Sequence, residues 1–170
     1  MNEMQTVKRH FFAMRNGIIA DTLRRAGSPY HIIFGLNLPQ LSDIAAMTPH
    51  TVELADALHA NASTRCSRLM APMLHPVEDM TAEKAGQWID DVLCAEEADI
   101  LCHRLLRRLS FAPELVAELP GSCGKWPVYT RLRLLANLRA IGRECPDIDI
   151  SPYLSDPHPE IASLARMLSE

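Results

Sequence analysis

Aromatic residues and glycine are scarce in this 170-residue chain, and long apolar runs are missing. Only 5% of the residues are aromatic and seven are glycine, whereas 48% are hydrophobic, with leucine and alanine plentiful. This combination favours helices. No apolar stretch approaches the about 20 residues that a membrane span needs, and the first residues show no apolar run followed by a small-residue cleavage site. We therefore expect neither a membrane-spanning segment nor a signal peptide.

Cysteine pairs at metal-ligand spacing are also missing. The chain has five cysteines, Cys66, Cys94, Cys102, Cys123 and Cys145. Their odd number and the lack of a C-x-x-C pair are typical of a cytoplasmic protein with reduced thiols. Cys102 and His103 are adjacent and would point in different directions on a helix, so we expect no metal site. GSCGK at 121–125 lacks the spacing of a phosphate-binding loop, which leaves a polar loop and no cofactor.

Charge is distributed unevenly along the chain. The formal net charge of −4 argues weakly against nucleic acid as a partner. Residues 101–143, however, carry eight basic and two acidic groups, and seven of the eight are arginines. The planar guanidinium can bond two phosphate oxygens at once. A solvated helical surface also produces such a block, so both interpretations stay open.

Apolar residues recur at helical spacing almost throughout the chain. In residues 95–109 they follow the i, i+3, i+4, i+7 pattern of an amphipathic helix, from Ala98 to Leu109. Trp88 shares such a stripe and is expected in the core. The pattern predicts helices at about 5–14, 17–26, 39–47, 50–60, 64–74, 81–93, 95–109, 112–119, 128–141 and 159–168.

Three local signals interrupt this pattern. The stretch YHIIFGLNLPQL at 30–41 is interpreted as a buried extended segment or a short helix. Pro72 is expected to kink or end its helix. Thr48 before Pro49 is typical of an N-cap followed by proline at the first helical position.

The predicted helices form neighbouring pairs joined by short links. Each pair takes up about 25–35 residues, close to the helix-pair repeats of solenoids. The pattern therefore predicts an all-α fold of stacked antiparallel helix pairs, a HEAT-like solenoid rather than a closed bundle, in a single domain spanning 1–170.

Four stretches carry a resemblance to a known family. FFAMRNGIIADTLRRAG, IIFGLNLPQL, RCSRLMAPML and MTAEKAGQWIDDVLCAEEADILCHRLLRRL resemble the HEAT-like DNA alkylation repair family of AlkD-like alkylpurine DNA glycosylases, mainly over residues 45–143. The resemblance implies a stack of helix pairs with a concave basic face that holds duplex DNA by its backbone. It also implies removal of cationic alkylated purines by a carboxylate and two tryptophans, without flipping the base into a pocket.

Only part of the family's site is matched here. Its Trp-x-x-x-Asp element falls on AEEAD, so Asp99 matches the catalytic carboxylate while Ala95 replaces the tryptophan. The second tryptophan belongs to a later repeat, and none follows Trp126 before the chain ends at Glu170. Arg131 matches an arginine that contacts the sugar-phosphate region. The resemblance thus implies a shortened, divergent relative.

Asp99 has two interpretations. Near the start of a helix it is favoured by the helix dipole, and His103 four residues on is within reach of an ion pair. Alternatively, it lies on the shoulder of the apolar stripe and faces DNA as a catalytic group. Trp126, just before Pro127, is either a packing anchor at a helix start or a platform for stacking on nucleic acid.

These observations lead to one predicted function and one alternative. We expect a protein that binds the duplex DNA backbone, with base excision weak or lost. The DNA-contacting residues are predicted to be Arg104, Arg107, Arg108, Arg131, Arg133 and Trp126. A working glycosylase would need Trp126 to replace the missing tryptophans. The alternative is a protein-interaction scaffold with no nucleic-acid role.

Overall fold

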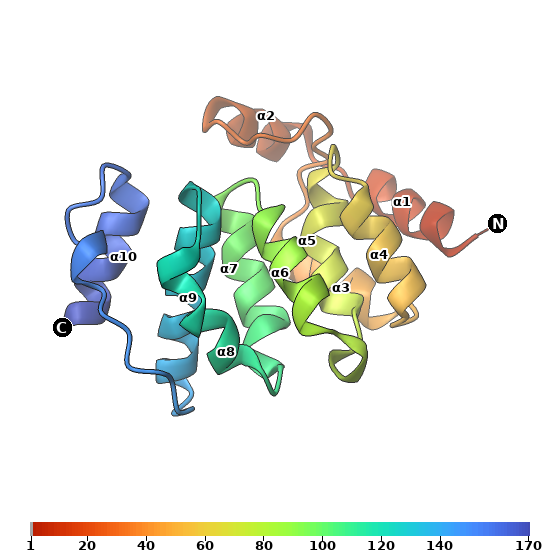
Figure 1. Ribbon diagram of the computed structural model, residues 1–170. Coiled ribbons are helices and arrows are strands. Elements are labelled where there is room, and N and C mark those ends of the chain that lie inside the picture. The colour runs from red at the N-terminus through yellow and green to blue at the C-terminus, as the bar shows by residue number, and fades with distance from the viewer. Residues whose placement is uncertain (1) are drawn as a thin grey trace. The chain divides into compact units, whose positions relative to one another are not determined.

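A computed structural model describes residues 2–170, and the regular structure in that range is helical (Figure 1). Each of the ten predicted helical segments contains an α-helix, which confirms the all-α prediction. The α-helices of the described residues are α1 Glu3–Ala13, α2 Gly17–Arg25, α3 Leu38–Ala46, α4 Val52–Ala60, α5 Arg65–Leu74, α6 Ala82–Asp90, α7 Ala95–Arg104, α8 Ala112–Ala117, α9 Lys125–Ala140 and α10 Pro159–Ser169. Short 3₁₀ turns occur at η1 Val77–Asp79, η2 Leu106–Arg108, η3 Leu119–Gly121 and η4 Ser151–Tyr153.

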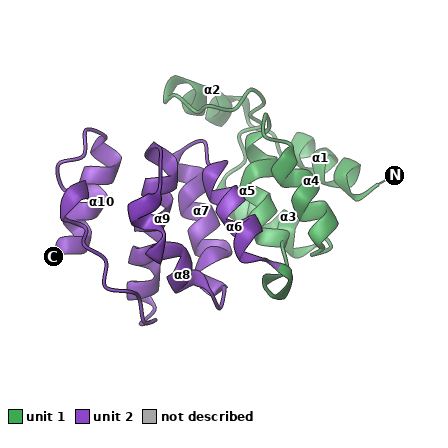
Figure 2. Ribbon diagram, in the orientation of Figure 1, with its two compact units in different colours: residues 1–79 green, residues 80–170 purple. Residues whose placement is uncertain are grey.

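The described chain divides into two compact units, residues 2–79 and 80–170 (Figure 2). The prediction of a single domain spanning 1–170 stays a prediction. No described helix is both long enough and apolar enough to cross a bilayer.

In the first unit, α5 is the central helix. It packs against α4 and α3, and every one of its residues is buried. Buried Arg65 at its start donates from Nη1 to the carbonyl of Leu36, 2.9 Å away and just before α3. The starts of α3 and α5 therefore lie together, with α4 returning between them. Pro72, expected to kink or end its helix, lies inside α5, which continues to Leu74, so the predicted end at Pro72 is wrong.

The segment before α3 is extended, and it crosses the start of α2 closely. Ile32 forms an isolated parallel bridge with Thr64, and Asn16 donates its backbone N–H to the carbonyl of Phe34 at 2.7 Å. Gly35 has φ +81°, and a Cβ there would lie 2.1 Å from the Asn16 carbonyl oxygen. This position therefore requires glycine.

One predicted cap is wrong. The helix expected to start after Thr48 begins at Val52, with Thr51 as the N-cap whose hydroxyl accepts from the Leu54 N–H. The Thr51 hydroxyl oxygen is within reach of the Leu54 N–H and therefore caps the helix. The Thr48 hydroxyl donates instead to the Ile44 carbonyl at the end of α3.

The second unit is built on α9, which packs against α6, α7, α8 and α10. The predicted 95–109 helix is interrupted: α7 ends at Arg104, and the 3₁₀ turn η2 follows. A 3₁₀ turn brings residues three apart into line, and Leu106 and Leu109 both point into the core. Arg143 satisfies the carbonyls of Arg107 and Leu109 at this break, at 2.8 and 2.9 Å.

The close approach at Gly35 makes a stability prediction. Gly35→Ala should lower the free energy of unfolding by about 2 kcal/mol or more, because the new Cβ meets backbone and φ is positive. Chemical denaturation followed by far-UV circular dichroism measures the change. Gly86→Ala is the matched control: nothing lies within 4 Å of its Cβ position inside α6, so stability should rise by about 0.5–1 kcal/mol. Equal effects of the two changes would contradict the prediction.

Candidate functional site

The sequence-predicted carboxylate Asp99 lies in a polar and aromatic cluster between α7 and α9. Its Oδ1 accepts a hydrogen bond from the Tyr129 hydroxyl at 2.8 Å and pairs with Arg133 Nε at 3.2 Å. Trp126 meets the Tyr129 ring edge-on, with centroids 5.6 Å apart and planes at 83°. These four residues, Asp99, Tyr129, Arg133 and Trp126, are called the Asp99 cluster below.

Helical geometry explains why three members come from one face of α9. At about 100° per residue, Trp126, Tyr129 and Arg133 fall within about 60° of one another. Tyr129 is the residue that sequence reasoning missed. Its spacing of three from Trp126 and four from Arg133 was the available signal, but only the packing of α7 shows that this face meets Asp99.

The carboxylate of Asp99 in this cluster is partly shielded from water. Burial raises the pKa of Asp99 above its ordinary value, while the Tyr129 hydrogen bond and the Arg133 charge act in the opposite direction. Burial and the Asp99 carboxylate together raise the pKa of Tyr129, so its hydroxyl remains a donor at neutral pH. Asp99 Oδ2 has no protein partner within residues 2–170, and 38% of the side chain is exposed, so this oxygen can accept from a ligand or water.

The expected ion pair between Asp99 and His103 is wrong. The carboxylate is occupied by Tyr129 and Arg133, which approach from α9. His103 is exposed, and its pKa is lowered by partial burial and by the charges of Arg107 and Arg104. A neutral histidine beside two arginines is a poor partner for a carboxylate.

The predicted DNA-contacting arginines separate by their exposure. Arg108 is exposed at the end of η2, and Arg104, Arg107 and Arg133 are half-buried. Arg108 Nη1 reaches the Arg104 carbonyl at 3.5 Å, so these residues lie on neighbouring turns. The charges of Arg107 and Arg104 both lower the pKa of His103.

Arg131 is in a different environment. Only 7% of its side chain is exposed, its Nε donates to the Leu115 carbonyl at 3.0 Å, and its Nη2 pairs with Glu118 at 3.1 Å. It lies about 160° around α9 from Arg133, on the side that packs against α8. In this structure its guanidinium anchors α8, and the predicted DNA contact at Arg131 stays untested.

The two tryptophans differ as the sequence suggested. Trp88 is 4% exposed and belongs to the core, which confirms that prediction. Trp126 is half-buried and keeps part of its ring accessible. Lys125 Nζ lies 4.4 Å from the centroid of the Trp126 ring.

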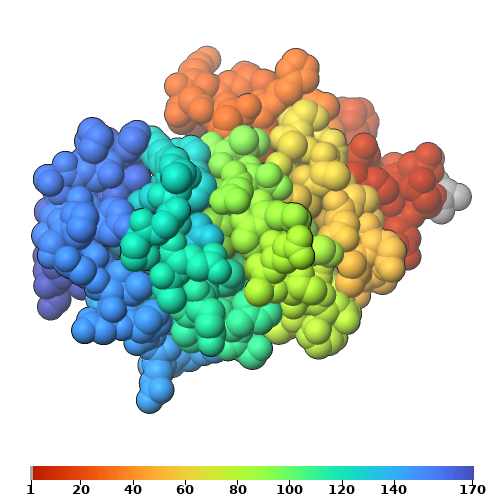
Figure 3. Space-filling view, in the orientation of Figure 1, coloured from red at the N-terminus to blue at the C-terminus, as the bar shows by residue number. Residues whose placement is uncertain are grey.

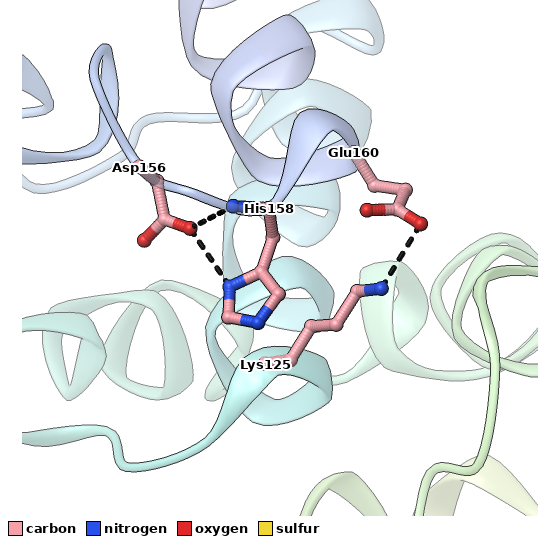
Figure 4. Close-up of polar contacts among 4 residues, drawn as sticks. All are labelled: Lys125, Asp156, His158 and Glu160. Atoms are coloured by element: carbon pink, nitrogen blue, oxygen red, sulfur yellow. Dashed lines mark hydrogen bonds and ion pairs between the residues drawn. The ribbon is translucent and has the colours of Figure 1, made fainter.

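A second polar group ties the start of α10 to the start of α9 (Figure 4). Lys125 Nζ pairs with Glu160 Oε1 at 3.0 Å, and Asp156 Oδ1 contacts His158 Nδ1 at 2.9 Å. Asp156 also accepts from the His158 backbone N–H at 2.8 Å. None of these contacts was predicted; the Lys125–Glu160 pair joins residues 35 positions apart, which sequence spacing does not reveal.

No group of three metal-ligating side chains is close enough to hold an ion within residues 2–170. All five cysteines are free thiols. Cys123 is exposed in the predicted polar loop, on a groove of about 650 Å³ that Glu118 and Arg131 also line. Glu118 and Arg131 pair with each other across this groove, and Asp90 also lines it.

No protein-family model, curated protein or solved structure matches this chain.

The ionised carboxylate of Asp99 should lower the free energy of unfolding. Because its folded-state pKa is raised, the ionised form is disfavoured by folding, and the stability of the wild type falls as pH rises through that pKa. Asp99→Asn keeps a hydrogen-bond acceptor without the charge. It should raise the free energy of unfolding at pH 7 by less than about 1 kcal/mol, since the group is more than a third exposed and screened.

The measurement is thermal or urea unfolding of both forms across a pH series. The difference between the forms should become independent of pH below the ordinary carboxyl pKa, where Asp99 is neutral in both states. Destabilisation by Asp99→Asn at pH 7 would make the carboxylate a structural ion-pair residue and contradict this prediction.

Proposed function

We propose that this chain is a HEAT-like helical-repeat protein that binds the duplex DNA backbone, related in fold to the DNA alkylation repair glycosylases, with base excision weak or lost. The single observation that carries the proposal is the Asp99 cluster. It joins a carboxylate, an arginine and two aromatic rings on one partly exposed face of the second unit.

The directions of the helices support a repeat architecture within each unit. In the first unit, Arg65 links the start of α5 to the start of α3, so those helices run the same way with α4 returning between them. In the second unit, Asp99 contacts α9 near its start, while Arg143 just after α9 binds carbonyls at 107 and 109. Helices α7 and α9 therefore also run the same way, with α8 between them. Alternating helix directions of this kind are expected of stacked helix pairs.

Phosphate binding is the chemistry that the exposed arginines favour. Arg108 is exposed, and Arg104, Arg107 and Arg133 are half-buried. Guanidinium groups bond phosphate in two-pronged geometry, and no base contact is needed to hold a backbone. The five free thiols fit a cytoplasmic location, where thiols stay reduced.

Efficient excision is disfavoured by the same cluster. Ala95 stands where the resemblance calls for a tryptophan, and Asp99 Oδ1 is already occupied by Tyr129 and Arg133. Trp126 is the remaining aromatic for a cationic purine, but the Lys125 ammonium lies against its ring. A cation at that position opposes the approach of a second one.

The alternative, a protein-interaction scaffold, is favoured by the charge of the second unit. Residues 80–170 contain ten Lys or Arg and fourteen Asp or Glu, a net charge of −4. DNA binding then depends on the local arginine surface rather than on the net charge.

DNA binding should be salt-dependent. The full chain and a fluorescent duplex oligonucleotide are titrated by anisotropy across a salt series. With four phosphate contacts, log Kobs against log salt should have a slope of about −3.6. Arg108→Gln should reduce that slope by about 0.9, because one phosphate contact is lost. Arg166→Gln removes the same charge from exposed α10 and is the matched control, with the slope unchanged. Absence of binding at low salt would overturn the proposal and favour the scaffold.

Excision should be weak. Release of methylated purine from alkylated duplex DNA should be the same small amount for wild type and Asp99→Asn. A working glycosylase would lose about 100-fold or more when its charge-stabilising group is removed. A loss of that size here would show that the family chemistry survives, with Trp126 as the substitute aromatic.

A further inference from the structure

Lys125, the first residue of α9, makes two contacts that act on Trp126. Its Nζ is 3.0 Å from Glu160 Oε1 on α10 and 4.4 Å from the centroid of the Trp126 ring. Figure 4 shows the lysine side chain reaching across to the glutamate. The carboxylate therefore holds the ammonium where it covers one face of the ring.

The hold of Glu160 on Lys125 is incomplete. Glu160 Oε1 takes the lysine, but Oε2 is buried and has no hydrogen-bond partner among the described residues. The pKa of Glu160 is nevertheless lowered, chiefly by a hydrogen bond from its own backbone and then by Lys125, so the carboxylate stays ionised and can hold the ammonium. The pair is also accessible to solvent, with 29% of the lysine and 40% of the glutamate side chain exposed. Exposed ion pairs contribute little net free energy, so a phosphate that binds nearby can compete with the carboxylate for the ammonium.

The position of Lys125 continues the Asp99 cluster. Lys125 contacts Trp126, Trp126 contacts Tyr129, and Tyr129 donates to Asp99, which pairs with Arg133. These contacts form a row that runs from Lys125 to Arg133. A polyanion that binds Arg133 at one end of the row would reach Lys125 at the other end, next to the aromatic rings. Phosphodiesters repeat along one strand, so one strand can occupy both cations.

We propose that Lys125 is a phosphate-binding residue of this interface, which Glu160 holds over Trp126 in the free protein and which nucleic-acid phosphate draws away. The proposal rests on the DNA-binding function proposed above. Binding at Lys125 then uncovers the Trp126 ring, so phosphate contact and exposure of the aromatic surface occur together. The lysine and glutamate were absent from the sequence-based site.

The first arm of the experiment needs no DNA. Acrylamide quenching of tryptophan fluorescence reports on Trp126, because Trp88 is 4% exposed and contributes little. Glu160→Gln removes the charge that holds the lysine, and Lys125→Ala removes the covering group. Both should raise the quenching constant of the free protein. Glu114→Gln is the matched control, since it removes an exposed carboxylate of α8 from the same unit and should leave quenching unchanged.

The second arm is duplex-DNA anisotropy with the same variants. Glu160→Gln should bind about two- to fivefold more tightly, because the carboxylate no longer competes with phosphate. Lys125→Ala should bind more weakly, with a salt slope smaller by about 0.9. If Lys125 binds phosphate, the two variants change the DNA affinity in opposite directions. If the Lys125–Glu160 pair is purely structural, both variants bind DNA more weakly.

The two arms distinguish the ways in which the proposal fails. Unchanged quenching in Glu160→Gln, with DNA binding intact in the wild type, overturns the covering of Trp126 alone. Raised quenching in both variants without DNA binding by any form overturns the proposed function and the phosphate role of Lys125 with it. Circular dichroism and thermal unfolding of each variant establish that the quenching change is local rather than a loss of fold.

Discussion

The packing of α7 against α9 is the contact on which the second unit depends. It buries the leucines of both helices, and Cys102 Sγ donates to the Thr130 carbonyl across the interface at 3.3 Å. The same contact fixes the rotation of α9, which turns Tyr129 and Arg133 toward Asp99 and Arg131 toward α8. The leucines of α7 and α9 are buried, and close packing leaves this rotation little freedom; Figure 3 draws the same orientation as a space-filling view.

That rotation divides the arginines of α9, and the contacts at its end divide those nearby, into structural groups and groups that stay at the surface. Arg131 and Arg143 use their guanidinium groups on backbone carbonyls and on Glu118, and they close α8 and η2 against α9. Arg133 and Arg108 remain at the surface of the same unit. A high count of basic residues is therefore a poor measure of a binding surface, since burial decides which of them can meet a ligand.

The Asp99 cluster combines features that a purely structural pair does not need. Its carboxylate is partly dehydrated, keeps one oxygen open, and lies next to two aromatic rings. Groups with perturbed pKa values in such places are frequent at functional sites. The Lys125–Glu160 pair at the other end of the row adds a second, exchangeable charge, so the surface contains both an open acceptor and a covered ring.

The sequence by itself determined the helices, because periodic apolar residues specify which face each helix buries. All ten predicted segments are helical, and Trp88 lies in the core as its stripe required. Only the tertiary structure determined which side chains pair with one another across helices. The break after Arg104, the pairing of Asp99 with Tyr129 instead of His103, and the burial of Arg131 all depend on contacts between residues distant in sequence. Spacing along one helix predicts which side chains are neighbours, but the rotation of the facing helix determines which of them meet across the interface.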